Sequence, residues 1–332
     1  MGEAGTMKAV VIAEPGGPEV LQVREVPRPE PGPGQIRVRV RSGGVNRADL
    51  LQRIGGYPAP PGWPGEIPGL EYAGTVEAVG PDVHLWGEGD RVMGLAGGGA
   101  YAEAVVVHER TAVRVPADTP LEHAGAIPEV FMTAFDALFS QARLGLGETL
   151  LVHAVGSGVG TAGIQLAAAA GARTVGTSRT PEKVERALAL GLDAGVVADE
   201  DWAERVEEAL EGEGADVILD LVGGAYLAAN QKLLGRTGRH IVVGVPSGNR
   251  TEIDLRALMG RRGRIQGTVL RARPLEEKAA LARVFERRVV PLFEAGRVKP
   301  VVEGSFPPEE AGAAHRFMEE NRNFGKLLIT WE

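Results

Sequence analysis

A glycine-rich turn between two apolar runs carries the residue types best suited to chemistry in this chain. Leu150 to His153 is a short apolar run that predicts a buried strand, and residues 155–160 (VGSGVG) follow it directly. An Ala-rich helix is predicted after the turn. Glycines allow backbone N–H groups to approach a pyrophosphate, and the helix N-terminus adds unpaired donors and a positive dipole end. The pattern therefore predicts a dinucleotide-binding site.

The pattern G-x-G-x-x-G can be placed on this segment in two registers. The literal match is Gly158, Gly160 and Gly163, which places the glycines inside the helix and away from the strand end. We favour Val155, Ser157 and Gly160 at the three equivalent positions. A tight strand-to-helix turn without a ligand is the alternative. The predicted phosphate contacts are Gly156, Ser157, Gly158 and Val159.

The end of the next predicted strand, residues 174–177, indicates which dinucleotide is expected. An NAD site places Asp or Glu about 20 residues after the glycine turn, where the acid binds the ribose hydroxyls. Here Thr177 and Ser178 are followed by Arg179 and Lys183, with no acid at the strand tip. Cations and hydroxyl groups complement a 2′-phosphate, so NADPH is expected rather than NADH. The alternative places Arg179 and Lys183 at the solvated start of a helix.

The composition is that of a globular protein with room for two domains. The chain has 332 residues, of which 44% are hydrophobic, and no apolar run reaches the roughly 20 residues that span a membrane. The net charge of −8 disfavours a nucleic-acid surface. The first residues lack the charged-then-apolar pattern of a signal peptide, so a cytoplasmic location is expected, with the first strand starting at Met7.

Cysteine is absent from the chain, which removes disulfides, thiolate nucleophiles and cysteine-ligated zinc from consideration. The histidines are scattered without metal-like spacing. His153, at the end of a predicted strand, is interpreted as a packed strand residue.

The predicted elements change character along the chain. Residues 7–115 are β-rich, with short runs such as 36–40, 74–79 and 102–107. From about residue 120 to 268 helices and strands alternate, which is the pattern of a doubly wound parallel sheet. Its predicted strands are 149–153, 174–177, 195–197, 217–220, 240–244 and 264–268, and its later helices are 183–190, 203–210, 226–233 and 255–261. Helices at 275–295 and 308–320 and a last strand at 326–330 follow.

Several segments together identify a family. They are Met7–Val10, Gly44–Arg53, Pro68–Val76, Ala126–Glu129, His153–Gly160 and Gly325-Lys326. In order and spacing they resemble the zinc-free quinone oxidoreductases, the zeta-crystallin-like branch of the medium-chain dehydrogenase/reductases, and the wording of residues 45–53 (VNRADLLQR) is nearest to the p53-inducible type. The resemblance implies a Rossmann doubly wound parallel sheet inserted in a GroES-like β-barrel catalytic domain. It implies a catalytic domain of residues 1–126 and 270–332, and an NADPH-binding domain of residues 127–269.

The resemblance also bears on the chemistry near the first domain's predicted site. Zinc-containing relatives carry Gly-His-Glu where this chain has Gly69-Leu70-Glu71, and leucine cannot bind a metal, so no zinc is expected. Asn46 and Asp49 are expected to line the nicotinamide end of the cleft. Asn46 would donate a side-chain N–H to the acceptor oxygen. Capping of the following helix is the alternative for Asp49. Arg53 would bind a carboxylate or carbonyl or, alternatively, pair with Glu71.

The remaining site predictions concern substrate and nicotinamide. Tyr57, in a loop rich in proline and glycine, offers a flat face and a phenol to a ring substrate, unless it packs locally. Ligands of such sheets bind at the carboxyl ends of strands. Some relatives place a tyrosine against the 2′-phosphate where this chain has Ala198. The predicted nicotinamide contacts are Thr133, Gly244, Val245 and Leu270, together with Asn46.

The predicted function is zinc-independent transfer of hydride, or of single electrons, from NADPH to a quinone. Reduction of an activated C=C bond, as in an enone or alkenal, is the alternative enzyme. A non-catalytic NADPH-binding protein of structural or RNA-binding role is the alternative from another class, and the acidic charge weighs against RNA. By analogy, pairing of the edge strand 264–268 predicts a homodimer or homotetramer.

Overall fold

The alternating helices and strands in the middle of the chain form a fully parallel sheet in the computed structural model, which describes residues 5–332. The strand order is β10-β9-β8-β11-β12-β13, so the sheet starts at its centre and reverses direction between β8 and β11. This is the predicted doubly wound Rossmann order. The strands are β8 (Thr149–Val152), β9 (Arg173–Ser178), β10 (Ala194–Val197), β11 (Ala215–Asp220), β12 (Leu234–Val242) and β13 (Arg264–Gly267).

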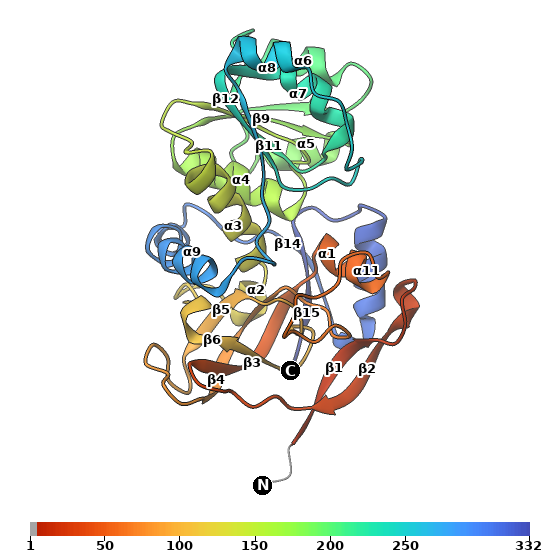
Figure 1. Cartoon of the computed structure of the whole chain (residues 1–332), viewed down its shortest axis with the longest axis vertical. Coiled ribbons are helices and arrows are strands. Elements are labelled where there is room, and N and C mark those ends of the chain that lie inside the picture. The colour runs from red at the N-terminus through yellow and green to blue at the C-terminus, as the bar shows by residue number, and fades with distance from the viewer. Residues whose placement is uncertain (1–4) are drawn as a thin grey trace. The chain divides into compact units, whose positions relative to one another are not determined.

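Helices connect these strands (Figure 1). The Leu150–Val152 run of β8 is fully buried, as expected for a parallel strand covered on both faces. The helix α5 begins with proline after a Thr180 cap, a sequence that favours a helix start. The connecting helices are α4 (Gly158–Ala169), α5 (Pro181–Leu188), α6 (Trp202–Ala209), α7 (Leu227–Leu233) and α8 (Leu255–Arg261), with a 3₁₀ turn η4 (Gly224–Tyr226).

One strand of this sheet differs from its prediction. The strand β12 begins at Leu234 rather than at residue 240, because the segment 234–239 (LGRTGR) pairs with β11 through a register shift between Ala215 and Val217. Thr237 takes a positive φ of 59° there. The glycines that indicate a turn in the sequence therefore lie in an irregular strand.

The two ends of the chain together build a second, mainly antiparallel unit, the GroES-like barrel. The last strand, β15, pairs with β3 through Leu328 and Gly44, which joins the C-terminus to the N-terminal segment. A separate hairpin pairs β1 with β2. The strands are β1 (Thr6–Ile12), β2 (Leu21–Pro27), β3 (Gln35–Gly44), β4 (Glu71–Val79), β5 (Arg91–Leu95), β6 (Ala104–His108), β7 (Ala112–Arg114), β14 (Val302–Phe306) and β15 (Lys326–Thr330).

Short helices complete this unit. The predicted helix 275–295 is divided at Val289, because Pro291 cannot donate the backbone hydrogen bond that would continue it. The helices are α1 (Arg47–Arg53), α2 (Leu121–Ala124), α3 (Pro128–Phe135), α9 (Leu275–Arg288), α10 (Val290–Glu294) and α11 (Ala311–Glu319). Single turns of the barrel unit are η1 (Pro18–Val20), η2 (Glu109–Thr111) and η5 (Pro308–Glu310). A π-helical segment, η3 (Asp136–Gln141), continues α3 and belongs to the Rossmann unit.

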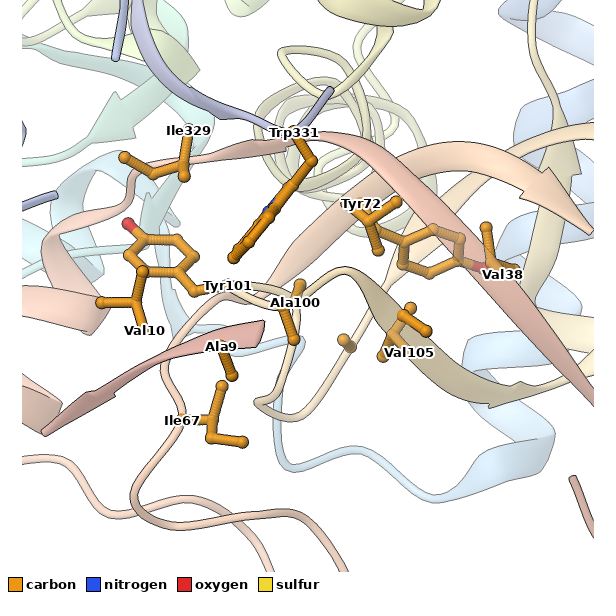
Figure 2. Packing of buried hydrophobic residues seen from close by; sticks show 14 of the residues in the cluster. Ala9, Val10, Val38, Ile67, Tyr72, Ala100, Tyr101, Val105, Ile329 and Trp331 are labelled. Atoms are coloured by element: carbon orange, nitrogen blue, oxygen red, sulfur yellow. The ribbon is translucent and has the colours of Figure 1, made fainter. Parts of the chain in front are cut away.

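The core of the barrel unit gathers side chains from both ends of the chain. Figure 2 shows Tyr101, Val10 and Ile329 close together with Trp331. By its contacts the chain divides after Met132 and after Val269, so that Thr133–Val269 forms the Rossmann unit and the rest forms the barrel unit.

Candidate functional site

The glycine turn connects β8 to α4 in the Rossmann unit. Ser157 caps the helix, and its Oγ accepts a hydrogen bond of 3.0 Å from the backbone N of Gly160. The helix begins at Gly158, so the glycines of the literal pattern all lie within α4, as the favoured register predicted. A Cβ on Gly160 would lie 2.4 Å from the carbonyl oxygen of Ala154. Only glycine fits at this position.

The turn has backbone donors left over. Among residues 5–332 the N–H groups of Gly158 and Val159, the first two of α4, have no acceptor. Orphan donors at a helix start, with a positive dipole end, suit a pyrophosphate oxygen. The turn therefore fits the dinucleotide predicted from the sequence.

The end of β9 places the predicted 2′-phosphate residues on one strand-to-helix turn. Ser178 is the last residue of β9, Arg179 is exposed, and Lys183 lies in the first turn of α5. Thr177 is buried, and its hydroxyl lies 2.9 Å from Nδ1 of His153. Thr177 thus has a structural partner already, whereas Ser178, Arg179 and Lys183 lie at the strand's carboxyl end.

An aromatic pair at this edge was missed by the sequence reasoning. Trp202 starts α6 and stacks on Tyr226, just before α7, with ring centroids 4.4 Å apart. His153 packs edge-on against both rings. The charge of Arg179 lowers the pKa of Tyr226 against a larger rise from burial, which brings this phenol into the electrostatic range of the β9 end. Their positions after strands β10 and β11 are the signal that could have found them.

Buried hydrogen bonds link the residue after β8 to α7 and the last residue of β11 to β12. The His153 Nε2–H donates to Asn230 Oδ1 at 2.7 Å, and His240 Nε2 lies 2.9 Å from Asp220 Oδ2. Burial lowers the pKa of His153 to about 4, so the ring is neutral at pH 7. The contacts are those of a packed strand residue, which was the interpretation preferred for His153.

Two of the predicted nicotinamide residues border an open pocket of about 350 Å³ at the ends of β12 and β13. Gly244 and Val245 line it together with Thr268. Thr133, in α3, and Leu270, after the last Rossmann strand, are 7% and 6% exposed. Backbone groups, rather than side chains, are what Gly244, Val245 and Leu270 can offer to a carboxamide.

Asn46 occupies the N-cap of α1 in the barrel unit. Its Nδ2 group donates to Glu71 Oε1 at 2.9 Å and to Gly44 O at 3.1 Å. Its Oδ1 accepts from Lys326 Nζ at 2.7 Å. Both amide hydrogens predicted to serve an acceptor oxygen are therefore bonded within the protein. Donation to a substrate would require one of these bonds to break.

Glu71 and Lys326 form a buried ion pair beside Asn46. Lys326 Nζ lies 2.7 Å from Glu71 Oε1, and the two side chains are 3% and 0% exposed. Lys326 also donates to Val45 O at 2.7 Å. The other oxygen of Glu71 accepts from the backbone N of Glu129 at 2.7 Å. The carboxylate is thus fully satisfied by the chain itself.

Asp49 has the contacts of a helix cap, the alternative considered for it. Its Oδ2 accepts from Asn46 N at 2.8 Å and its Oδ1 accepts from Gly69 N at 3.0 Å. The Tyr101 hydroxyl lies 3.4 Å from Oδ2. Burial raises the pKa of Asp49 to about 6, although the backbone donors favour the charged form.

The alternative prediction for Arg53, a pair with Glu71, was wrong. The guanidinium is buried and pairs with Glu319 on α11, and its Nε donates to Gly16 O at 2.9 Å. His315 Nδ1 lies 3.2 Å from Nη1. Arg53 thus has three partners within the barrel unit, and Glu71 pairs with Lys326 instead.

Tyr57 lies over a buried arginine. The guanidinium carbon of Arg271 is 5.0 Å from the Tyr57 ring centroid, a cation–π distance. Arg271 also donates to Tyr57 O, Gly97 O and the Gln52 side chain. The loop that carries Tyr57 is therefore held by Arg271, and the ring's other face remains the one to consider for a flat substrate.

No group of three or more His, Asp or Glu side chains suited to a metal occurs within residues 5–332. In the same part of the chain no helix combines the length and apolar character needed to cross a bilayer.

Family models match both units. Residues 32–117 match the alcohol dehydrogenase GroES-like domain, and residues 158–286 match the model described as zinc-binding dehydrogenase. A Rossmann sheet with a GroES-like barrel defines an NAD(P)-dependent oxidoreductase of the medium-chain type.

The chain belongs to the medium-chain dehydrogenase/reductase superfamily and is quinone oxidoreductase-like. It is 32% identical over 329 residues to the quinone oxidoreductase of Lama guanicoe, covering 97% of both chains. It is 36% identical over 293 residues to the spectinabilin polyketide synthase system protein NorB of Streptomyces orinoci, but these span only 13% of that protein.

Solved structures agree with this placement. An NAD-dependent alcohol dehydrogenase superposes with a TM-score of 0.88 at 33% identity, covering 98% of this chain and 100% of the other. A mycobacterial protein solved in complex with NADPH superposes with a TM-score of 0.87 at 28% identity, covering 98% and 100%. NAD(P)H binding is therefore typical of the proteins that this chain resembles.

Proposed function

We propose that this protein is a zinc-independent oxidoreductase, near the p53-inducible type, that transfers hydride from NADPH to a quinone. The observation that carries the proposal is the end of β9, where Ser178, Arg179 and Lys183 follow the strand and no acid occupies its tip. A hydroxyl and two cations complement a 2′-phosphate dianion, so this end of the site should bind NADPH more tightly than NADH.

The chain's own groups would hold the dinucleotide at several points. The amides at residues 156–159 would bind the pyrophosphate, since two of them have no partner. Gly244, Val245 and Leu270 would offer backbone groups to the nicotinamide carboxamide. Thr133 and Asn46 would also contact the nicotinamide. When bound, NADPH supplies the hydride; the protein supplies binding, orientation and exclusion of water.

A quinone suits a site that has no metal Lewis acid. Hydride addition converts the quinone to an aromatic hydroquinone, so the acceptor needs little polarisation. Tyr57, held by Arg271, offers its ring to the flat substrate. Zinc is not required in this proposal, because Leu70 cannot be a ligand and Glu71 is paired with Lys326.

An enone or alkenal reductase is the second candidate. A C=C bond conjugated to a carbonyl accepts hydride at carbon with the same cofactor geometry, and the aromatic face of Tyr57 does not discriminate against it.

We also propose that the active form is a homodimer or homotetramer. The strand β13 is the edge of the Rossmann sheet, and its exposed row of backbone groups is a template for pairing. Val269, directly beyond this strand, is 58% exposed. A second copy of β13 would extend the sheet across the two subunits.

The test is the oxidation of NADPH and of NADH with ortho- and para-quinones, enones and alcohols as acceptors. Turnover of quinones with NADPH is expected, with a lower kcat/KM for NADH. Turnover of enones alone would favour the second candidate. Tight NADPH binding without turnover of any acceptor would refute the enzymatic proposal, and a preference for NADH would refute the role of Arg179 and Lys183.

A further inference from the structure

Hydride transfer to a quinone leaves a hydroquinone anion that needs one proton. Of the barrel-unit groups predicted to face the substrate, Asn46 has both amide hydrogens bonded to Glu71 and Gly44. Asp49 accepts from two backbone N–H groups. Arg271, which holds the Tyr57 loop, donates to three acceptors. These side chains are already engaged within the protein, which leaves the Tyr57 phenol and the carboxyl group of Glu129 as the proton donors to compare.

Glu129 differs from them. It stands in the first turn of α3, is partly exposed, and its carboxyl group makes no hydrogen bond to any residue between 5 and 332. Its backbone N–H binds Glu71 Oε2 at 2.7 Å, and Glu71 Oε1 in turn binds Asn46. The backbone of Glu129 is therefore linked through one carboxylate to the residue predicted to lie at the reacting end of the cofactor.

Burial and the charges around Glu129 together keep its carboxyl group protonated. Burial is the largest cause, the negative charges of Glu71 on β4 and Asp49 on α1 add to it, and Lys326 on β15 and Arg271 oppose it. Lys278 on α9 also lies within electrostatic range. Together they raise the pKa of Glu129 to about 8. At pH 7 the carboxyl group is therefore mostly protonated, whereas an ordinary glutamate is ionised.

We propose that Glu129 is the catalytic acid that protonates the reduced acceptor. The inference rests on the proposed reductase function. In the step, the dinucleotide gives up hydride, the quinone gains two electrons and becomes the hydroquinone anion, and the O–H bond of Glu129 breaks as the anion's O–H bond forms. Water then returns a proton to the Glu129 carboxylate. The sum is one dinucleotide, one proton and one quinone converted to oxidised dinucleotide and hydroquinone.

The test compares wild type with Glu129→Gln, which keeps the shape but cannot transfer a proton. Glu88→Gln, on an exposed loop, is the matched control. For quinones whose reduced anions are strongly basic, we expect kcat to fall about 100-fold in Glu129→Gln, within the range of general acid catalysis. For weakly basic anions, which water protonates readily, the loss should be small. A purely structural role would reduce both equally.

The pH profile gives the second readout. Wild-type kcat should be level below pH 8 and fall above it, because the acid must be protonated, and Glu129→Gln should lack this limb. If the limb stays in Glu129→Gln and disappears in Tyr57→Phe, the proton comes from Tyr57 and the proposal is overturned. Equal losses across the quinone series overturn it too.

Stability without cofactor provides a readout independent of turnover. A carboxyl whose folded pKa is raised contributes stability below its unfolded pKa and loses it as pH rises through the folded pKa. The melting temperature of wild type should therefore fall, relative to Glu129→Gln, from about pH 5 to pH 8 and level off above that range. If Glu129→Gln folds poorly, Glu129→Ala with added acetate replaces it, and rescue of kcat is expected. A wild type that reduces no acceptor overturns the function as well as this role, whereas active wild type with unchanged Glu129→Gln overturns this role alone.

Discussion

Replacing Lys326 by methionine should destabilise the barrel unit strongly. The ammonium group donates to Val45 O, Asn46 Oδ1 and Glu71 Oε1, each at 2.7 Å, and the side chain is 3% exposed. Methionine fills the volume but leaves the Glu71 carboxylate, with no exposed surface, without its counter-charge. Breaking a buried ion pair from one side costs about 3–5 kcal/mol. For a unit of this size that corresponds to a drop in melting temperature of roughly 10 °C.

The assay is unfolding followed by tryptophan fluorescence in a Trp202→Phe background. Trp202 is the tryptophan of the Rossmann unit, so the remaining three report on the barrel unit, and Trp331 is buried in its core. In a double-mutant cycle, Lys326→Met with Glu71→Gln should cost much less than the sum of the single changes, by about 2 kcal/mol or more. Additive costs, or a single change below about 1 kcal/mol, would show that Lys326 does not neutralise Glu71.

Four further outcomes are expected. Lys183→Ala should raise KM for NADPH with little effect on kcat; an unchanged KM would assign this lysine to the solvated surface. NADPH binding should quench the fluorescence of Trp202, and Tyr226→Phe should weaken binding of 2′,5′-ADP about 5-fold while leaving 5′-ADP unchanged, since a phenol within range of a phosphate contributes about 1 kcal/mol; equal losses for both ligands would mean that Tyr226 only supports the fold. Val269→Glu should shift light-scattering mass toward the monomer, and an unchanged mass would rule out this edge as the interface.

The regular elements could be predicted because hydrophobic periodicity is local. The strand β15 and the helix α8 have the predicted bounds, since each is a short run with clear ends. The irregular start of β12 could not, because its pairing with β11 is set by a neighbouring strand and not by its own glycine-rich residues. The break between α9 and α10 was also missed, although Pro291 is a local signal that marks it.

The types of the site residues could be predicted from the sequence, but their hydrogen-bond partners could not. Asn46 and Asp49 could be selected from the sequence, but Asn46 has partners on β4 and β15, and Lys326 is 280 residues from Asn46 in sequence. The same holds for Arg53, whose partner Glu319 lies 266 residues away. A side chain's chemistry is set by which of its donors and acceptors are already taken, and that depends on contacts that no local pattern contains.

The charges around Glu71 give the proposed zinc independence a second line of support. From the sequence, that argument depends on missing ligands: Leu70 in place of histidine and the absence of cysteine. In the structure the remaining carboxylate, Glu71, has a built-in cation, because the ammonium of Lys326 lies 2.7 Å from it and is held by two further acceptors. A metal ion at Glu71 would have to displace this ammonium and leave a second positive charge buried beside it. The charge balance of the cluster, and not only its ligand count, therefore favours an unassisted hydride acceptor such as a quinone.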